Sequence, residues 1–316
     1  MEIKQLVLRD LSTDLDQLAD LASIDPQLVL VFGYTEHFAA PELHMALASY
    51  FPNAQRAGCS TAGEITSAGV STQTTVITAI RFTSTQFKIA TAEITAMEHS
   101  FDAGKALAAQ LHSTELRALL ILGQGVNING SAMIEGIVSE LGDSLPITGG
   151  LAADDGAFVK TYTLSNAGVS TSAIVGIGFS GDKLVFSHGS FGGWKPFGPT
   201  RKVTRSAGNI LYELDGEPAL EVYQRYLGEY AKDLPGSGLL FPFEMLGDAR
   251  ESLGQIRTIL GIDATTGSLV LAGEINPNGY LRLMHAHTND LVDGAETAAQ
   301  ASIANIESAY GQTLGL

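Results

Sequence analysis

Cysteine is nearly absent from this chain of 316 residues, in which Cys59 is the single example. One thiol excludes an internal disulfide and fits a reducing compartment. The first residues, Met1 to Lys4, show no basic segment followed by an apolar one, and no run approaches the ~18 apolar residues of a membrane span. We therefore expect a cytoplasmic protein that does not cross a membrane.

Basic residues are also scarce, with 18 Lys and Arg against 34 Asp and Glu and a formal net charge of −16. This charge repels polyanions, which makes nucleic acid and anionic membranes poor partners and leaves small ligands as candidates. Glycine is abundant instead, at 35 residues, and its share exceeds the usual ~7%. We attribute it to tight turns between short strands. The length predicts about two domains, each able to bury its own core.

A series of motifs occurs twice in the same order. Each copy has an apolar run, a helix-like segment ending in proline, a Gly-rich stretch, a Gly-Val-Ser-Thr sequence and a strand-like run. The pairs are residues 28–33 and 119–123, Pro52 and Pro146, residues 58–64 and 149–155, residues 69–72 and 168–171, and residues 76–82 and 174–179. This repeat indicates an internally duplicated α/β unit, in which we interpret the Gly-rich stretches as turns.

Hydrophobic periodicity and turn signals predict an α/β fold: two connected domains of β-sheets flanked by helices, with the duplicated unit inside. Helices are expected at residues 10–22, from Pro41, at 132–141, from Pro218 to about Tyr230, and from near Asp290. The tripeptide Ser180-Gly181-Asp182 predicts a hairpin that joins residues 174–179 to a strand at 183–190.

Together, these motifs resemble those of the FIST family of sensory proteins over nearly the whole chain. The resemblance lies in residues 28–33, 58–65 and 149–155 for a FIST N domain, and in residues 203–205, 213–216 and 284–295 for a FIST C domain. It implies a FIST N-like domain at 1–182 and a FIST C-like domain at 183–316. Family members generally continue into another strand-rich segment, so the second domain is expected to lack its C-terminal segment.

Within the family, the segment Ser187 to Pro199, with the sequence SHGSFGGWKPFGP, is similar to that of the NosP-type haem proteins, which sense nitric oxide. This similarity implies haem b as a cofactor and sensing as the function, without enzymatic turnover. It also implies a partner that acts in trans, either a histidine kinase or a cyclic-di-GMP enzyme (a diguanylate cyclase or phosphodiesterase). The sequence leaves homodimer formation open.

The residues of this segment suit haem chemically. A strand at 184–188 places His188 on one face with Leu184 and Phe186, and a neutral imidazole among apolar side chains is the setting of an iron ligand. The competing interpretation is a core histidine bonded to a backbone carbonyl.

Aromatic and basic side chains alternate beyond His188. Phe191, Trp194 and Phe197 would wall the haem, and Arg201 and Arg205 would meet its propionates. The competing interpretation is a solvated hairpin whose basic residues protect a strand edge.

Two other functions stay open. A haem-free sensory module could bind a small metabolite, such as an amino acid, through the Gly-rich turns around Gly58 and Gly149. A hydrolase or transferase could use Cys59 or Ser60 as nucleophile, which requires a histidine or carboxylate within hydrogen-bond reach.

Weaker site candidates remain. His285 and His287 could share a metal on one strand face, although a polar face is the simpler interpretation. Asp154 and Asp155 could form a carboxylate pair, but they follow a turn where aspartate is locally favoured. The sequence Gly123-Gln124-Gly125 is best explained as a structural turn between strand and helix.

Overall fold

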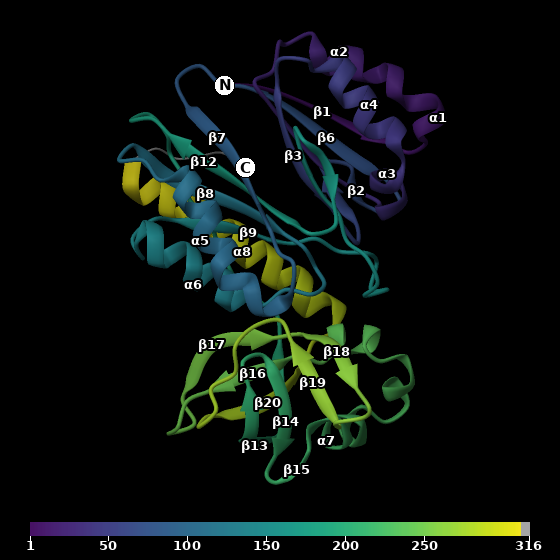
Figure 1. Ribbon diagram of the computed structural model, residues 1–316, viewed down its shortest axis with the longest axis vertical. Helices are drawn as coiled ribbons and strands as arrows, with labels where there is room; N and C mark the ends of the chain where they lie inside the picture. Colours follow the sequence, from purple (N-terminus) through teal and green to yellow (C-terminus); the bar gives the residue numbers. More distant parts are fainter. Residues whose placement is uncertain (311–316) are drawn as a thin grey trace. The chain divides into compact units, whose positions relative to one another are not determined.

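A computed structural model describes residues 1–310 of the chain. It divides into two compact units, Met1–Leu184 and Val185–Leu316. Each unit is a mixed arrangement of β-sheet and helix (Figure 1). The predicted α/β fold of sheets flanked by helices is therefore confirmed.

The first sheet of the N-terminal unit has the strand order β1-β6-β2-β3-β10-β11. Its strands are β1 (Glu2–Leu8), β2 (Leu28–Gly33), β3 (Gln55–Ser60), β6 (Thr75–Arg81), β10 (Thr163–Ser165) and β11 (Gly168–Ser170). Only β2 and β3 run parallel to each other in this sheet. The associated helices are α1 (Leu11–Asp14), η1 (Leu15–Gln17), α2 (Leu18–Ala22), α3 (Thr35–Ala39) and α4 (Pro41–Tyr50). They cover one face, where Leu18, Leu43 and Leu47 are fully buried against strand residues such as Val29.

The second sheet has the order β7-β12-β8-β9. Its strands are β7 (Gln86–Glu93), β8 (Leu116–Gly123), β9 (Ile147–Leu151) and β12 (Ala173–Ser180), and its helices are η2 (Met97–His99), α5 (Ser100–Leu111) and α6 (Gly130–Leu141). Leu107 of α5 and Ile137 of α6 are fully buried in the core on this sheet. A further core, which includes Leu28, Cys59, Leu122 and Val175, joins the two sheets. The unit is thus layered as helix, sheet, sheet and helix (Figure 1).

The duplication expected from the sequence is visible in the strand pairing. The order β1-β6-β2-β3 of the first sheet has its counterpart in β7-β12-β8-β9 of the second. Gly58 lies opposite Val31 in the parallel pair β2–β3, and Gly149 lies opposite Ile121 in the parallel pair β8–β9.

The Gly-rich stretches are not the tight turns that we expected, since β3 continues to Ser60 and β9 to Leu151. A Cβ on Gly58 would lie 2.0 Å from the carbonyl oxygen of Val31, and one on Gly149 would lie 1.8 Å from that of Ile121. Both glycines are therefore required by the close approach of neighbouring strands.

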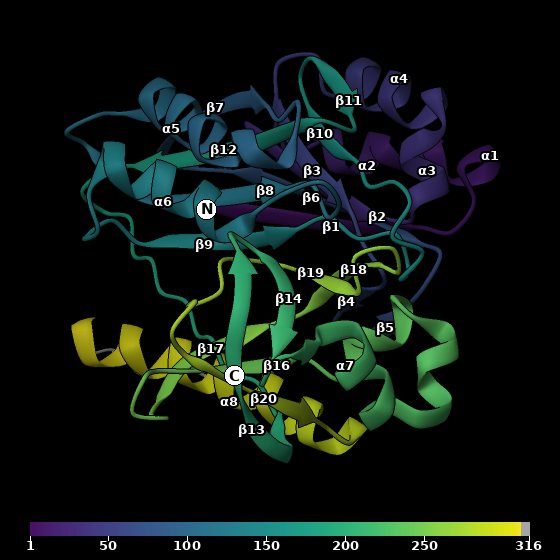
Figure 2. The same cartoon turned by 60° about the horizontal axis from the view of Figure 1, so that its bottom comes forward.

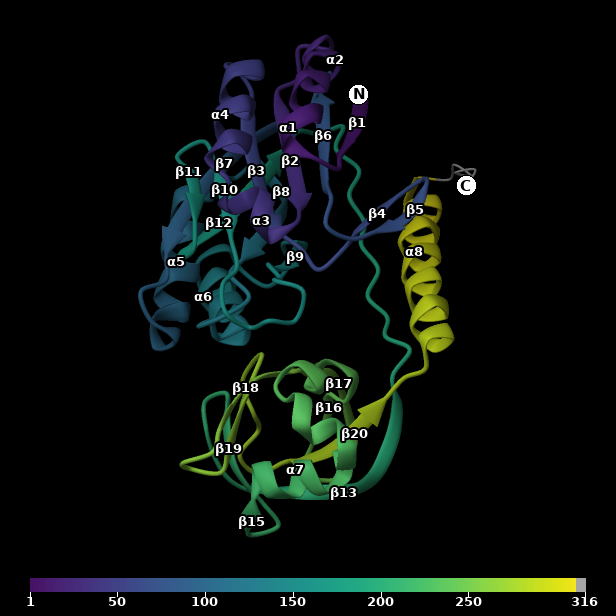
Figure 3. The ribbon, with the colours of Figure 1, turned by 90° about the vertical axis from the view of Figure 1, so that its right-hand side faces the viewer.

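The C-terminal unit contains a strongly curved antiparallel sheet with the order β17-β16-β20-β13-β14-β19-β18 (Figure 3). The strands are β13 (Lys195–Ala207), β14 (Ile210–Leu214), β15 (Glu217–Pro218), β16 (Phe243–Leu246), β17 (Ser252–Arg257), β18 (Ile259–Asp263), β19 (Ser268–Leu271) and β20 (Tyr280–His285). The helices are α7 (Ala219–Leu227), η3 (Gly228–Asp233), η4 (Gly236–Leu240) and the long α8 (Thr288–Tyr310). Helix α7 packs on β14 and β19 and buries Val222, Tyr223 and Leu227 in the core (Figure 2).

Several local expectations were wrong. Residues 185–194 form an irregular segment rather than the second strand of a hairpin. The helix expected at residues 10–22 is divided into α1, η1 and α2. The strand β1 and the helix α5 were not expected from the sequence. Neither segment combines a strong hydrophobic periodicity with clear start and stop signals.

Candidate functional site: a cavity in the C-terminal unit

The irregular segment 185–194 lies directly on helix α8. A Cβ on Gly189 would lie 1.9 Å from the carbonyl oxygen of Ala298, and one on Gly193 would lie 1.7 Å from that of Asp290. Next to this contact, the Lys195 ammonium donates to the Asp290 carboxylate at 2.6 Å. The glycines therefore let the segment approach the helix backbone closely.

His188 lies in this segment and is exposed. Its ring centroid is 6.1 Å from that of Phe186, with the rings tilted. Within residues 1–310, the imidazole makes no hydrogen bond or ion pair. The strand face that was expected to hold His188 is not formed, and the alternative of a buried core histidine is also wrong. The imidazole is instead exposed to solvent.

A cavity of about 690 Å³ lies beside the same segment. Its apolar lining comes from Phe191, Trp194, Ile256 and Met284. The volume falls in the range of about 300–1,000 Å³ that is usual for sites of small molecules and cofactors. Phe191 is 60% exposed, which is unfavourable for a large apolar side chain unless something covers it.

The charged group in the cavity lining is the buried carboxylate of Glu244, which forms an ion pair with Arg282. The Glu244 side chain accepts from Arg282 through Nε at 3.0 Å and through Nη2 at 2.6 Å, both at Oε2. Ser252 donates to Oε1 at 2.7 Å. Glu244 and Ser252 both line the cavity. Because the ion pair is satisfied within the protein, the cavity presents little net charge to an apolar ligand.

The other aromatic residue of the predicted site lies elsewhere. The Phe197 ring is 5.4 Å from that of His285 and 6.5 Å from that of Phe241, centroid to centroid. It does not line the cavity with Phe191 and Trp194. The expected wall of three aromatic residues is therefore reduced to two.

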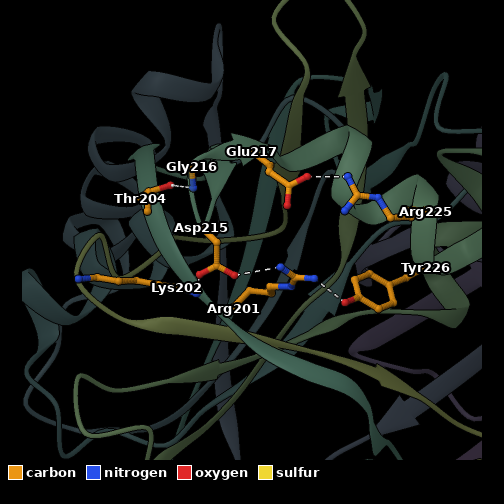
Figure 4. A network of polar contacts seen from close by, with 8 residues as sticks. All are labelled: Arg201, Lys202, Thr204, Asp215, Gly216, Glu217, Arg225 and Tyr226. Carbon is orange, nitrogen blue, oxygen red and sulfur yellow. Dashed lines mark hydrogen bonds and ion pairs between the residues drawn. The ribbon is translucent and has the colours of Figure 1, made fainter.

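The two predicted propionate partners already have carboxylate partners. Arg201 donates to Asp215 at 3.1 Å and to the Tyr226 hydroxyl at 2.6 Å, in the network that Figure 4 shows. The hydrogen bonds to Tyr226 and Asp215 raise the pKa of the Arg201 guanidinium. Arg205 donates to Glu213 at 2.9 Å and lies over the Tyr212 ring. Neither arginine lines the cavity.

The predicted haem residues therefore divide into two groups. Phe191 and Trp194 share the cavity, and His188 lies two residues before Ser190, which also lines it. The apolar walls and the free imidazole suit haem. Phe197, Arg201 and Arg205 do not converge with them, so the structure provides no ready partner for the propionates from these residues.

The nucleophile hypothesis fails on geometry. Cys59 is buried in the core between the sheets, and burial raises the pKa of its thiol to about 12. The Ser60 hydroxyl donates to the carbonyl of Ala153 at 2.7 Å and accepts from the Tyr162 N–H at 3.0 Å. These partners are backbone groups, not the histidine or carboxylate that the hypothesis requires. Both residues serve the packing of the unit.

The remaining site candidates also have structural explanations. The rings of His285 and His287 are 5.4 Å apart, but among residues 1–310 no group of three or more side chains could hold a metal ion. Asp154 accepts the N–H groups of residues 158, 159 and 160, so it stabilises its own loop.

Sequence reasoning missed Glu244, Ser252, Ile256 and Met284. They come from β16, β17 and β20, at least 50 positions after Trp194 in the chain. The one available signal was a carboxylate within the apolar run Phe243–Leu246, all of which is buried.

In a comparison with known protein families, residues 27–217 match the FIST N domain and residues 219–314 match the FIST C domain. The first match alone covers more than half of the chain.

This chain belongs to the FIST family.

FIST domains are sensory modules of signal transduction rather than catalytic domains, and they generally act with signalling partners. The cavity and all of the predicted haem residues lie in the unit that contains the FIST C match, whereas in the sequence residues 188–205 fall within the FIST N match.

Individual relatives add little about the ligand. An uncharacterized protein of Methanocaldococcus jannaschii is 39% identical over 89 residues, which are 28% of this chain and only 17% of that protein. The crystal structure of a chorismatase aligns over 90% of this chain and 98% of its own, at 10% identity and a TM-score of 0.27. That score is too low to support an argument about fold or chemistry. None of the helices within residues 1–310 is both long and apolar enough to cross a membrane.

Proposed function

We propose that this FIST protein is a haem-based sensor of nitric oxide that regulates a separate signalling protein, a histidine kinase or a diguanylate cyclase or phosphodiesterase. The observation that carries the proposal is the cavity of about 690 Å³, with Phe191 and Trp194 in its lining, beside the segment that bears an unpartnered His188. Haem b is the proposed cofactor, and His188 would hold its iron. Of the six residues predicted from the sequence, His188, Phe191 and Trp194 are the three that support haem binding.

The protein would contribute the walls of the haem pocket, a ligand to the iron and the route of the signal. Phe191, Trp194 and Met284 would contact the faces and edges of the ring and keep water away from it. The imidazole of His188 would hold the iron through one ring nitrogen. A bound haem would supply ferrous iron as the site for nitric oxide, and His188 would link that iron to the segment 185–194.

The signal would leave through helix α8. A movement of His188 would displace the segment that contacts α8 at Gly189 and Gly193, where the two backbones meet without an intervening side chain. Two positions of the segment would then correspond to two positions of the helix, which a partner can distinguish.

Trp194 provides a direct test, because it is the single tryptophan of the chain and lines the cavity. Haem that binds in the cavity should quench the fluorescence of Trp194 with 1:1 stoichiometry as hemin is added, since the indole and the ring would be in contact. His188→Ala should weaken hemin binding at least about tenfold, the loss of one metal ligand, and alter the absorbance of the ferrous and nitric oxide forms. His112→Ala, which changes an exposed histidine of the N-terminal unit, is the matched control.

Other outcomes separate the parts of the proposal. Hemin absorbance without quenching of Trp194 places any bound haem outside the cavity and contradicts the proposed site. Equal titrations of the wild type and His188→Ala contradict the role of His188. Arg201→Ala should leave the affinity unchanged, because Arg201 is paired with Asp215 and does not line the cavity.

A haem-free sensor of a small metabolite is the second candidate. The glycines that first suggested such a site, Gly58 and Gly149, are explained by strand packing. The same cavity also suits this candidate, since Ser252 and the Glu244 carboxylate, which is paired with Arg282, would orient a polar group beside apolar walls. A change in Trp194 fluorescence with amino acids, and none with hemin, would support it over the haem sensor.

A further inference from the structure

The two copies of the duplicated unit each contain a short β-hairpin with the same internal pairing. In the first, β4 (Glu64–Thr66) and β5 (Gly69–Ser71) pair Ile65 with Val70. In the second, β10 and β11 pair Leu164 with Val169. Both hairpins contain the repeated Gly-Val-Ser sequence in their second strand. They are therefore the same structural element.

Only the second hairpin is joined to a sheet. Strand β10 pairs with β3, with Thr163 opposite Cys59 and Leu164 opposite Gly58. It thereby extends the first sheet, and Leu164 is fully buried in the core.

The first hairpin forms a separate two-stranded sheet, which in Figure 3 stands away from the sheets of its unit. Its residue Ile65, the counterpart of Leu164, is 79% exposed, and Val70 is 76% exposed. Two large apolar side chains side by side in water mark a surface that lacks its cover. An isolated two-stranded hairpin is also marginally stable without a partner.

The edge that would receive this hairpin is open. Strand β9 corresponds to β3 and ends its sheet, with no strand on its outer side among residues 1–310. Positions Gly58 and Cys59 of β3 are buried beneath β10, whereas the corresponding Gly149 and Gly150 of β9 are exposed. An open edge of this kind presents unpaired backbone groups and invites another strand.

The connection preceding the first hairpin is much shorter than its counterpart. The second copy uses residues 152–162 to lead from β9 to β10, including the loop held by Asp154. The first copy has only residues 61–63 between β3 and β4. The β4–β5 hairpin therefore cannot reach β9 of its own chain by a connection like the one that leads β10 to β3. A short hinge of this kind favours exchange of the hairpin between two chains.

We propose that two copies of this protein form a symmetric dimer in which each inserts its β4–β5 hairpin along β9 of the other. The register follows from the docked hairpin: Glu64 lies opposite Gly150, and Ile65 lies opposite Gly149. Each chain contributes one β4–β5 hairpin and one β9 edge strand. Two chains therefore form a closed assembly in which no hairpin and no β9 edge is left unpaired. The proposal does not depend on haem or on the cavity.

Sedimentation of the full chain over a range of concentrations tests the dimer. The wild type should dimerise, and Ile65→Asp should raise the dissociation constant at least about tenfold, which is about 1.4 kcal/mol. The side chain of Ile65 is largely in solvent, so the monomer should remain folded. Val159→Asp changes a residue of the same unit that is 78% exposed outside the hairpin, and it should dimerise as the wild type does. A monomeric wild type, or an Ile65→Asp variant that dimerises equally well, overturns the proposal.

Disulfide formation tests the register. Chains with Glu64→Cys are mixed with chains with Gly150→Cys, and copper phenanthroline oxidises the two thiols to a disulfide. Gly150 has space for a side chain, with no atom within 4 Å of an added Cβ, and the thiol of Cys59 is buried. A cross-linked dimer should form in the mixture and in neither variant alone. A third protein carries both Glu64→Cys and Gly150→Cys in one chain. A disulfide within that single chain would show that the hairpin pairs with β9 of its own chain, which overturns exchange between copies.

Discussion

Breaking the ion pair in the cavity lining should destabilise the C-terminal unit. In Arg282→Met, the long apolar side chain replaces most of the volume of arginine and removes its charge. Glu244 then retains the hydrogen bond from Ser252 but loses both bonds from the guanidinium. Its side chain is only 12% exposed, so water replaces the lost partner poorly.

The magnitude follows from the burial of the two partners. Removing one member of a fully buried pair typically costs about 3–5 kcal/mol. Here the Arg282 side chain is 31% exposed, which means that the pair is partly solvated already. We expect a loss of about 2 kcal/mol, equal to a shift of roughly 1 M in the midpoint of urea unfolding for a unit of this size.

The assay is urea unfolding followed by the fluorescence of Trp194, which reports on the C-terminal unit. Arg225→Met breaks a matched ion pair with Glu217, whose side chains are 56% and 42% exposed. That control should lose less than about 1 kcal/mol. If Arg282→Met is no less stable than Arg225→Met, the argument from burial is refuted. Adding Glu244→Gln to Arg282→Met should restore part of the loss, because no charge then remains buried.

Three further predictions concern the N-terminal unit. Burial lowers the pKa of the His37 imidazole in the folded protein. As the pH falls through about 6.5, the unfolded chain therefore binds the proton first, and the free energy of unfolding decreases. His37→Asn should reduce this pH dependence, measured by urea unfolding between about pH 7.5 and 5.5. Gly149→Ala places a Cβ 1.8 Å from the Ile121 carbonyl oxygen at a φ of 136°, and should cost about 3 kcal/mol or more, whereas Gly150→Ala should change thermal stability by no more than about 1 kcal/mol. The buried thiol of Cys59 should react with a thiol reagent at pH 8 only after unfolding in urea, and rapid labelling of the native protein would contradict its burial.

Much of the N-terminal unit could be predicted because the signals were local and occurred twice. The apolar runs at residues 28–33 and 119–123 became β2 and β8, and Pro41 opens α4 as expected. The glycines were misinterpreted for a physical reason. A glycine required by the close approach of another strand and a glycine required by a turn are the same letter in the sequence, and only the neighbouring backbone distinguishes them.

The candidate site was predicted in part. Phe191 and Trp194 were found because they cluster in sequence with His188, and they do share a cavity. Arg201 and Arg205 were assigned to the same site from proximity in sequence alone. In the structure they lie on the long strand β13, where Glu213 of the neighbouring strand β14 pairs with Arg205 and Asp215, in the turn after β14, pairs with Arg201.

The sequence by itself determined the family and the duplicated order of elements, because both depend on motifs whose residues lie close together in the chain. The tertiary structure alone decided that Glu244 and Arg282 meet beside Trp194, since their strands are neighbours only after the sheet has formed. It also decided that one hairpin is buried and its duplicate exposed. The two have the same internal register, and what differs is the sheet edge that each can reach.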